Sequence, residues 1–392
     1  MERIWIGNGR LVLPGRIVEN GSLLIEDGII AAMGLPCPEA ARRVDAGGGY
    51  ILPGFIDIHV HGGGGGDFMD ADPDSFLKAA RTHCAHGTTA LAVTTMSCPD
   101  ETLERVIDCY LGVDHRPAGG AELLGLHLEG PFFSQASRGA QPISEERVPD
   151  RAVLERFIRR AQGQILRWDA APELRNMELF ARVMREHGIL CAAAHTNANA
   201  TEIMDAFDWG FSHVTHFYNA VTTYHKENLI PHAGVVEATY IRDDVTIELI
   251  GDGRHVPKES FLLACKIKGP ERLAIITDAM RAAGTDVTES VLGAREGGVD
   301  VVIRDGVAML PSLVSFAGSI CTMDRALRVA HLRYGIPLTD VSRMLSLTPA
   351  RLCGADRRKG SLAVGKDADI VIMDADFAVR QVFARGCPCH EA

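Results

Sequence analysis

Eight short apolar runs, separated by segments with helical periodicity, fill most of this 392-residue sequence. In chain order, from Phe55 to Met280, the runs are FIDIHV, TTALAVTTM, ELLGLHLEG, ILRWDAAPE, ILCAAAHT, FSHVTHFYN, VTIELIGDG and RLAIITDAM. The intervening segments open with capping residues or proline, and several stop at glycine, as helices do: 72–87, 100–112, 176–188 and 258–269. Strands that alternate with helices indicate β/α units, and eight of them predict an α/β fold, a (β/α)8 barrel over residues 53–355.

The two ends of the chain have a different residue pattern. Residues 1–52 and 356–392 hold short β-like runs that are broken by glycine. Such punctuation is typical of an antiparallel sheet rather than of helices. We therefore expect a small β-sandwich domain that is built from both ends, and a hairpin insertion in the barrel near residues 293–310.

The charge and hydropathy of the chain exclude several classes of partner. Its formal net charge is −11, and it has no long basic run, which argues against binding to nucleic acid or to an anionic membrane surface. No stretch approaches the roughly 18 unbroken apolar residues of a membrane span. The N-terminal residues lack the apolar core of a signal peptide, so we expect a cytoplasmic protein.

Polar residues stand where the apolar runs end. In a (β/α)8 barrel the chemistry lies at the C-terminal ends of the strands. His59 and His61 are two residues apart on one predicted strand, so their side chains face the same way. Four histidines and two carboxylates at such ends are what two borderline divalent ions need as ligands. The predicted metal site consists of His59, His61, Glu129, His195, His216 and Asp278.

Seven segments carry a resemblance to a known family. GFIDIHVHG, LHLEGPFFS, AAAHTNA, VTHFYNAV, GDGRHV, TDAM and FAGSICTMD occur in the order found in the amidohydrolase superfamily. More narrowly, the chain resembles the N-acetylglucosamine-6-phosphate deacetylase family. The glutamate of HLEGP is the most diagnostic residue, because many relatives bridge their metals with a modified lysine on the fourth strand. The run ILRWDAAPE has no lysine, which fits this family.

The resemblance implies which residues hold metal. It makes Glu129, His195 and His216 the ligands of one ion and assigns a second ion to His59 and His61. Glu129 would bridge the two ions, and Asp278 would lie close to both. One or two divalent ions per chain are expected. Zinc is the expected metal for these nitrogen and oxygen ligands, and iron and manganese are the alternatives.

The resemblance also implies the substrate contacts: Ala140, Gln141, Asn219, Ala220, His255, Phe316, Ala317, Gly318 and Ser319. Two departures from the family pattern stand out. The family often has histidine where this chain has Gln141, and it often has a phosphate-binding arginine after the YNA stretch. Here that region reads VTTYHKENLIPHAG and has no arginine, so His225 and Lys226 are the cations expected to meet a phosphate.

The function that the resemblance implies is hydrolysis of the N-acetyl group of N-acetylglucosamine-6-phosphate. The products would be glucosamine-6-phosphate and acetate, in amino-sugar catabolism, and the enzyme would be a homodimer. Asp278 would accept a proton from the attacking water and pass it to the departing amine, and His255 would stabilise the oxyanion.

Other functions stay open at this point. The same scaffold would serve a deacetylase of N-acetylgalactosamine-6-phosphate, of an unphosphorylated N-acetyl sugar or of another amide. A cyclic-amide hydrolase or aminohydrolase is a further alternative, which the HLEGP glutamate disfavours. A non-enzymatic assembly protein on an inactive barrel is the third, and the presence of every expected ligand argues against it.

Overall fold

The barrel strands form one parallel sheet, as the sequence predicts. The computed structural model describes residues 3–143 and 145–391. Neighbouring strands follow chain order around the barrel, and a parallel bridge between Val60 and Ala279 brings its two edges together. The strands are β6 (Phe55–Val60), β9 (Thr88–Thr94), β10 (Glu122–Glu129), β11 (Ile165–Ala170), β12 (Leu190–Ala193), β13 (His213–Val214), β16 (Thr246–Ile250) and β17 (Leu273–Ile276).

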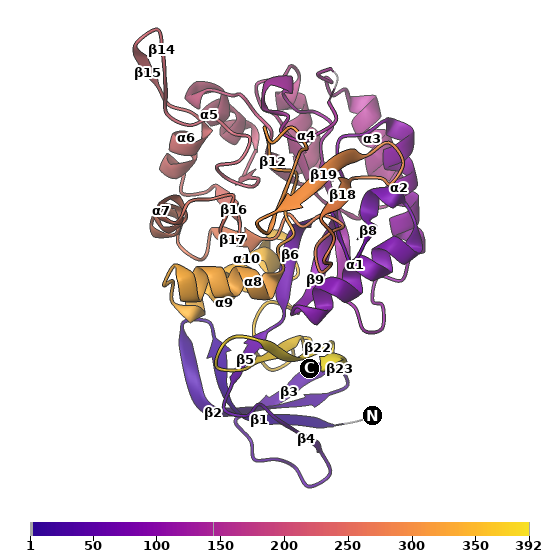
Figure 1. Cartoon of the computed structure of the whole chain (residues 1–392), viewed down its shortest axis with the longest axis vertical. Coiled ribbons are helices and arrows are strands. Elements are labelled where there is room, and N and C mark those ends of the chain that lie inside the picture. The colour runs from indigo at the N-terminus through magenta and orange to yellow at the C-terminus, as the bar shows by residue number, and fades with distance from the viewer. Residues whose placement is uncertain (1–2, 144, 392) are drawn as a thin grey trace.

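Helices surround these strands (Figure 1). Residues at the N-terminus of a helix can determine where it begins. In the first helix of the barrel, the Asp72 side chain accepts from the Ser75 N–H, and Pro73 occupies the first turn. The helices are α1 (Pro73–Ala85), α2 (Asp100–Gly112), α3 (Arg151–Arg160), α4 (Met177–Glu186), α5 (Ala200–Trp209), α6 (Val235–Ile241), α7 (Lys258–Lys268), α8 (Met323–Arg328), α9 (Leu338–Leu345) and α10 (Leu347–Leu352). Their apolar faces pack on the sheet, and this contact forms the largest hydrophobic core.

The chain ends form a second sheet below the barrel (Figure 1). Its strands are β1 (Ile4–Leu13), β2 (Arg16–Glu26), β3 (Ile29–Met33), β4 (Arg42–Asp45), β5 (Tyr50–Pro53), β21 (Ile370–Met373), β22 (Val379–Ala384) and β23 (Cys387–Glu391). A small β domain from both ends is thus confirmed, and its sheet is mixed rather than antiparallel throughout. After β3 the chain crosses back through residues 34–41, so β4 and β5 both pair with β1 in parallel.

Ion pairs join the C-terminal segment to the closed end of the barrel. Glu122, the first residue of β10, contacts Arg358 and lies 2.9 Å from the Lys359 ammonium. Burial would raise the pKa of Glu122, but these two cations hold it at about 2. The same lysine lies 2.6 Å from Asp369, just before β21. These contacts lie at the N-terminal ends of the strands, opposite the predicted site.

Two insertions extend from the barrel. The predicted hairpin near 293–310 is present as a three-stranded antiparallel sheet of β18 (Glu289–Leu292), β19 (Val299–Arg304) and β20 (Val307–Met309). A second hairpin, β14 (His225–Glu227) and β15 (Ile230–His232), was not predicted, because HKENLIPH has no strand-like alternation. It projects from the upper left of the molecule in Figure 1. Among the described residues, no helix is long and apolar enough to cross a membrane.

Candidate active site

The six predicted metal-site residues lie together at the C-terminal ends of the barrel strands. His59 is in β6 and Glu129 ends β10, while the other four follow their strands by one or two residues. All six are buried. His195, His216 and Asp278 have φ values of 45°, 27° and 50°, in the left-handed region that side chains other than glycine rarely adopt. Such strain clusters at functional sites, where the surrounding structure maintains it.

Glu129 joins two groups of possible metal ligands. In the first group, Glu129 Oε1 lies 3.3 Å from His195 Nε2 and 3.1 Å from His216 Nε2. In the second group, Glu129 Oε1 lies 3.5 Å from His59 Nε2, and Glu129 Oε2 lies 3.5 Å from His61 Nε2. One carboxylate therefore faces two pairs of imidazoles, an arrangement that suits a pair of cations.

The outer ring nitrogens of the histidines fix the direction of their lone pairs. His195 Nδ1 lies 3.0 Å from the Ser137 carbonyl oxygen, and His216 Nδ1 lies 3.1 Å from that of Asn219. A carbonyl oxygen only accepts, so each Nδ1 carries a proton. When the ring is neutral, each Nε2 atom therefore directs a lone pair into the space beside Glu129. The two Nε2 atoms are 3.1 Å apart, and a cation between them would satisfy both.

The charges of the cluster favour a cation. Burial would raise the pKa of Glu129, yet the neighbouring histidines hold it well below its usual range. Burial would likewise lower the pKa of His61 and of His216, but hydrogen bonds to Asp278 and Glu129 respectively raise both to about 9. Carboxylates that stay ionised among four imidazoles are a donor set that fits a bound metal ion.

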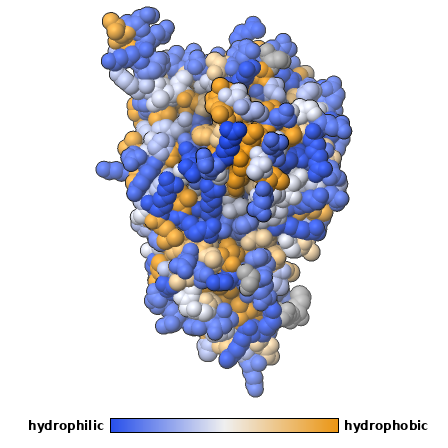
Figure 2. Space-filling view, in the orientation of Figure 1, coloured by the Kyte–Doolittle hydropathy of each residue, from blue (hydrophilic) through white to orange (hydrophobic). Residues whose placement is uncertain are grey.

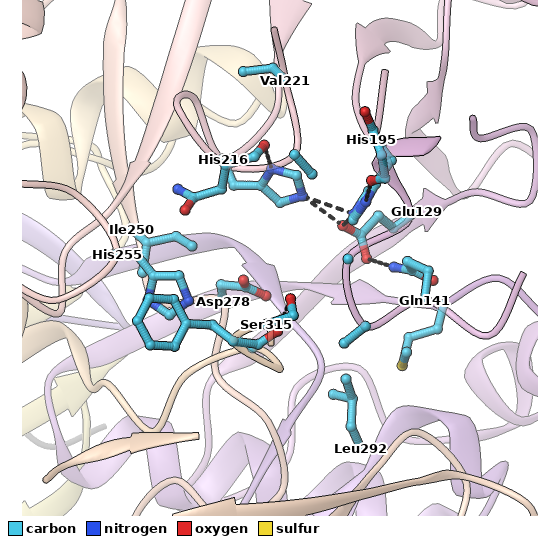
Figure 3. Close-up of a pocket in the computed structure, with 18 of the residues that line it drawn as sticks. Glu129, Gln141, His195, His216, Val221, Ile250, His255, Asp278, Leu292 and Ser315 are labelled. Carbon is cyan, nitrogen blue, oxygen red and sulfur yellow. Dashed lines mark hydrogen bonds and ion pairs between the residues drawn. The ribbon is translucent and has the colours of Figure 1, made fainter. Parts of the chain in front are cut away.

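Asp278 stands beside the histidines of the second group without belonging to either group. Its Oδ1 atom lies 3.2 Å from His61 Nε2 and 3.5 Å from His59 Nε2. Burial would raise the pKa of Asp278, but the positive potential of these histidines lowers it, so the side chain is a carboxylate. In Figure 3 it faces the open space between Glu129 and His255, which is where a reacting group would lie.

A cavity of about 420 Å³ opens above the cluster, within the size range of small-molecule sites. Most of the predicted substrate contacts line it: Ala140, Gln141, Asn219, Ala220, His255, Phe316 and Gly318. His255 Nδ1 donates to Asp252 Oδ2 over 2.7 Å, and the ring packs 4.6 Å from the Phe316 ring. The Asp252 contact fixes the tautomer of His255, so its Nε2 atom carries a lone pair when the ring is neutral.

Gln141 contacts the cluster directly. Its Nε2 atom donates to Glu129 Oε2 over 2.7 Å, and its Oε1 atom accepts from the Ser97 N–H over 2.9 Å. Both ends of the amide are therefore engaged by the protein. Gln141 orients the Glu129 carboxylate, in addition to lining the cavity.

Four predicted substrate residues do not line this cavity. Ala317 and Ser319 are buried behind it, and the Ser319 N–H donates to the Asp278 carbonyl oxygen over 2.7 Å, which supports the turn that carries Asp278. His225 and Lys226 are exposed on β14, in the projecting hairpin. His225 lines a neighbouring cavity beside Glu173 and Glu227.

Sequence patterns did not single out several lining residues: Ser137, Asn197, Thr222, Ile250, Leu292 and Ser315. Most lie in loops, where no periodicity marks direction. Ile250 and Leu292 read as ordinary core residues, and Leu292 reaches the site from β18 of the inserted hairpin. Of this set, only Asn197 stands in a segment, AAAHTNA, that carries the resemblance.

A barrel with paired histidines and carboxylates at its strand ends defines a class of metal-dependent hydrolases. The chain belongs to the amidohydrolase family, whose model matches residues 50–388.

Individual relatives show which members of this family the chain is similar to. The chain is 33% identical over 391 residues to the N-acetylglucosamine-6-phosphate deacetylase of Bacillus subtilis, covering 98% of this chain and 96% of that protein. It is 32% identical over 377 residues to the N-acetylgalactosamine-6-phosphate deacetylase of Escherichia coli O157:H7, covering 96% and 97%. Among solved structures, a mutant N-acetyl-D-glucosamine-6-phosphate deacetylase from Mycobacterium smegmatis, in complex with N-acetyl-D-glucosamine-6-phosphate, aligns with a TM-score of 0.89 at 29% identity over 99% and 100% of the chains.

Proposed function

We propose that this protein hydrolyses the N-acetyl group of N-acetylglucosamine-6-phosphate to give glucosamine-6-phosphate and acetate. The observation that carries the proposal is the Glu129 carboxylate shared by two histidine pairs beside Asp278, at the base of a cavity. The relatives named for this reaction, which align over nearly the whole chain, support the substrate. The reaction belongs to amino-sugar catabolism.

The protein would use one or two divalent ions per chain. Glu129, His195 and His216 would hold the first ion, and His59 and His61 the second, with Glu129 shared and Asp278 adjacent. Zinc is the metal that we propose, and iron and manganese suit the same ligands. When bound, such an ion supplies Lewis acidity to an amide carbonyl and makes water nucleophilic at neutral pH.

Two residues of the chain would handle the proton and the developing charge. Asp278 is ionised and faces the cavity, so it can accept a proton from the attacking water. The same carboxyl group then returns this proton to the departing amine, since one carboxylate can serve as base and then as acid. His255, oriented by Asp252, is placed to donate a hydrogen bond to the oxyanion when its Nε2 atom is protonated.

Acetate release from four sugars tests the proposed substrate: N-acetylglucosamine and N-acetylgalactosamine, each with and without a 6-phosphate. We expect N-acetylglucosamine-6-phosphate to have the highest kcat/KM. A charge-assisted contact to the phosphate corresponds to a preference of about 10- to 150-fold over the unphosphorylated sugar. No acetate release from any of the four would reject deacetylation of these sugars.

One observation favours a second candidate, the deacetylase of an unphosphorylated N-acetyl sugar. Within residues 3–143 and 145–391, the cavity has no lysine or arginine in its lining, and Lys226 lies outside it. Apart from histidine, a phosphate dianion in this cavity would meet no cationic side chain among the described lining residues. Equal kcat/KM for N-acetylglucosamine with and without the phosphate would make this second function the better description.

We also propose that the protein is a homodimer. The tip of the β14–β15 hairpin exposes Leu229, which is 91% accessible, and Ile230 beside it; orange atoms mark this tip at the upper left of Figure 2. Exposed apolar side chains on a projecting arm suit contact with a second copy.

We expect light scattering to give the mass of two chains for the native protein and of one chain for Leu229→Asp. Ile241→Asp, at an exposed isoleucine on α6, is the control and should leave the mass unchanged. A native protein with the mass of one chain would contradict the proposal.

A further inference from the structure

A layer of buried charge lies inside the barrel, next to the metal-ligand cluster. Arg167 and Asp169 of β11 and Glu248 of β16 are each at most 3% exposed. The interior of a (β/α)8 barrel is usually filled by branched apolar side chains. Buried ion pairs often contribute no more stability than apolar residues of the same volume, so stability alone does not account for them.

The guanidinium of Arg167 holds both carboxylates. Its Nη1 atom donates to Glu248 Oε2 over 2.6 Å, and its Nη2 atom donates to Glu248 Oε1 over 3.1 Å. Its Nε atom donates to Asp169 Oδ1 over 2.9 Å. A planar fork that is engaged on two sides cannot rotate, so Arg167 fixes the plane and position of the Glu248 carboxylate.

Glu248 in turn holds His59. Its Oε1 atom lies 2.7 Å from His59 Nδ1, whereas the nearest nitrogen of Arg167 lies 3.4 Å from that atom. The shorter contact, to a carboxylate that is ionised by its arginine partner, requires the proton on His59 Nδ1. His59 Nε2 then bears a lone pair, and it has no hydrogen-bond partner among the described residues although it is fully buried.

The unpartnered nitrogen points at the cluster, since it lies 3.5 Å from both Glu129 and Asp278. We propose that Arg167 and Glu248 are a positioning pair, in which Arg167 orients Glu248 and Glu248 sets the tautomer and direction of His59 as a metal ligand. Neither residue lines the cavity, so neither contacts the substrate. This inference rests on the proposed metal-dependent function. Glu248 Oε1 also accepts from the His216 backbone N–H over 3.2 Å, but His59 is the only one of the six cluster residues among the described residues whose side chain Glu248 contacts.

Zinc affinity, measured on metal-free protein in competition with a chelating dye, tests the pair without reference to turnover. The His59→Ala variant identifies which zinc-binding step depends on His59. We expect Glu248→Gln to weaken that step about 10- to 100-fold, the usual effect of losing a partner behind a metal ligand. The step that survives in His59→Ala should change by no more than about twofold. Arg167→Lys, which keeps the charge but loses the fork, should weaken the same step.

A double variant distinguishes the positioning of His59 from a general disruption of the metal site. Once His59 is absent, Glu248→Gln should change the remaining zinc-binding step by no more than about twofold. The control is Glu122→Gln, which alters another buried carboxylate held by two cations, at the opposite end of β10. It should leave both steps unchanged.

Three results would contradict the proposed positioning role of Arg167 and Glu248. One is that Glu248→Gln weakens both zinc-binding steps equally. Another is that the His59-dependent step keeps its wild-type zinc affinity in that variant. If Glu248→Gln does not fold, wild-type affinity in Arg167→Lys would overturn it as well. Failure of the native protein to bind zinc, iron or manganese would instead reject the metal-dependent function itself.

Discussion

Asp278→Asn should lower kcat for acetate release by about 10²- to 10⁴-fold, the range in which a general acid–base residue contributes. The asparagine keeps the shape of the side chain but cannot accept a proton. Because Asp278 lies outside both groups that converge on Glu129, we expect the metal content to be largely retained. Steady-state kinetics and metal analysis of the same preparation check the two parts of the prediction.

Asp286→Asn is the matched control, because Asp286 is an exposed aspartate eight residues further along the chain. It should have the turnover of the native protein. Near-normal turnover of Asp278→Asn would exclude Asp278 as the base. Loss of the metal together with turnover would assign Asp278 to metal binding rather than to proton transfer.

Glu129→Gln should remove metal from the whole site, because Glu129 is the one residue common to both ligand groups. The neutral amide is a weaker ligand and no longer balances the charge of a cation among four histidines. We expect metal content to fall to background and kcat/KM to fall by at least about a thousandfold, or about 4 kcal/mol of transition-state stabilisation. Elemental analysis and acetate release measure these effects.

Glu129→Asp is the graded control, since it keeps the charge and withdraws the carboxylate by one methylene. It should retain part of the metal and part of the activity. Comparison with His195→Ala and His59→Ala then separates the groups, because each of these variants disrupts only one. A Glu129→Gln protein that keeps its full metal content would contradict the shared role of Glu129.

The strands and the catalytic ends could be predicted because both are local patterns. An apolar run that stops at His195 or Asp278 identifies a strand end, and the barrel rule then places that end on the catalytic side. His59 and His61 share a face because residues two apart on a strand always do. These inferences need no knowledge of which strands become neighbours, and all eight strands are present.

The role of the charged layer could not be predicted, although the polar residues Arg167 and Asp169 alternate visibly within ILRWDA. Strands of a parallel barrel are buried on both faces, so alternation does not reveal which face turns inward. The partner of Arg167, Glu248, is 81 residues away in the chain. Only closure of the barrel brings them together.

Patterns along the chain are enough to predict the eight barrel strands, the types of residue at their ends and the division into a barrel with a β domain from both chain ends. The folded chain is needed to see that Gln141 and Glu248 orient cluster residues, and that His225 and Lys226 lie away from the cavity. The physical reason is that periodicity and capping act over a few residues. Convergence at a site depends instead on how distant strand ends and loops meet when the sheet closes.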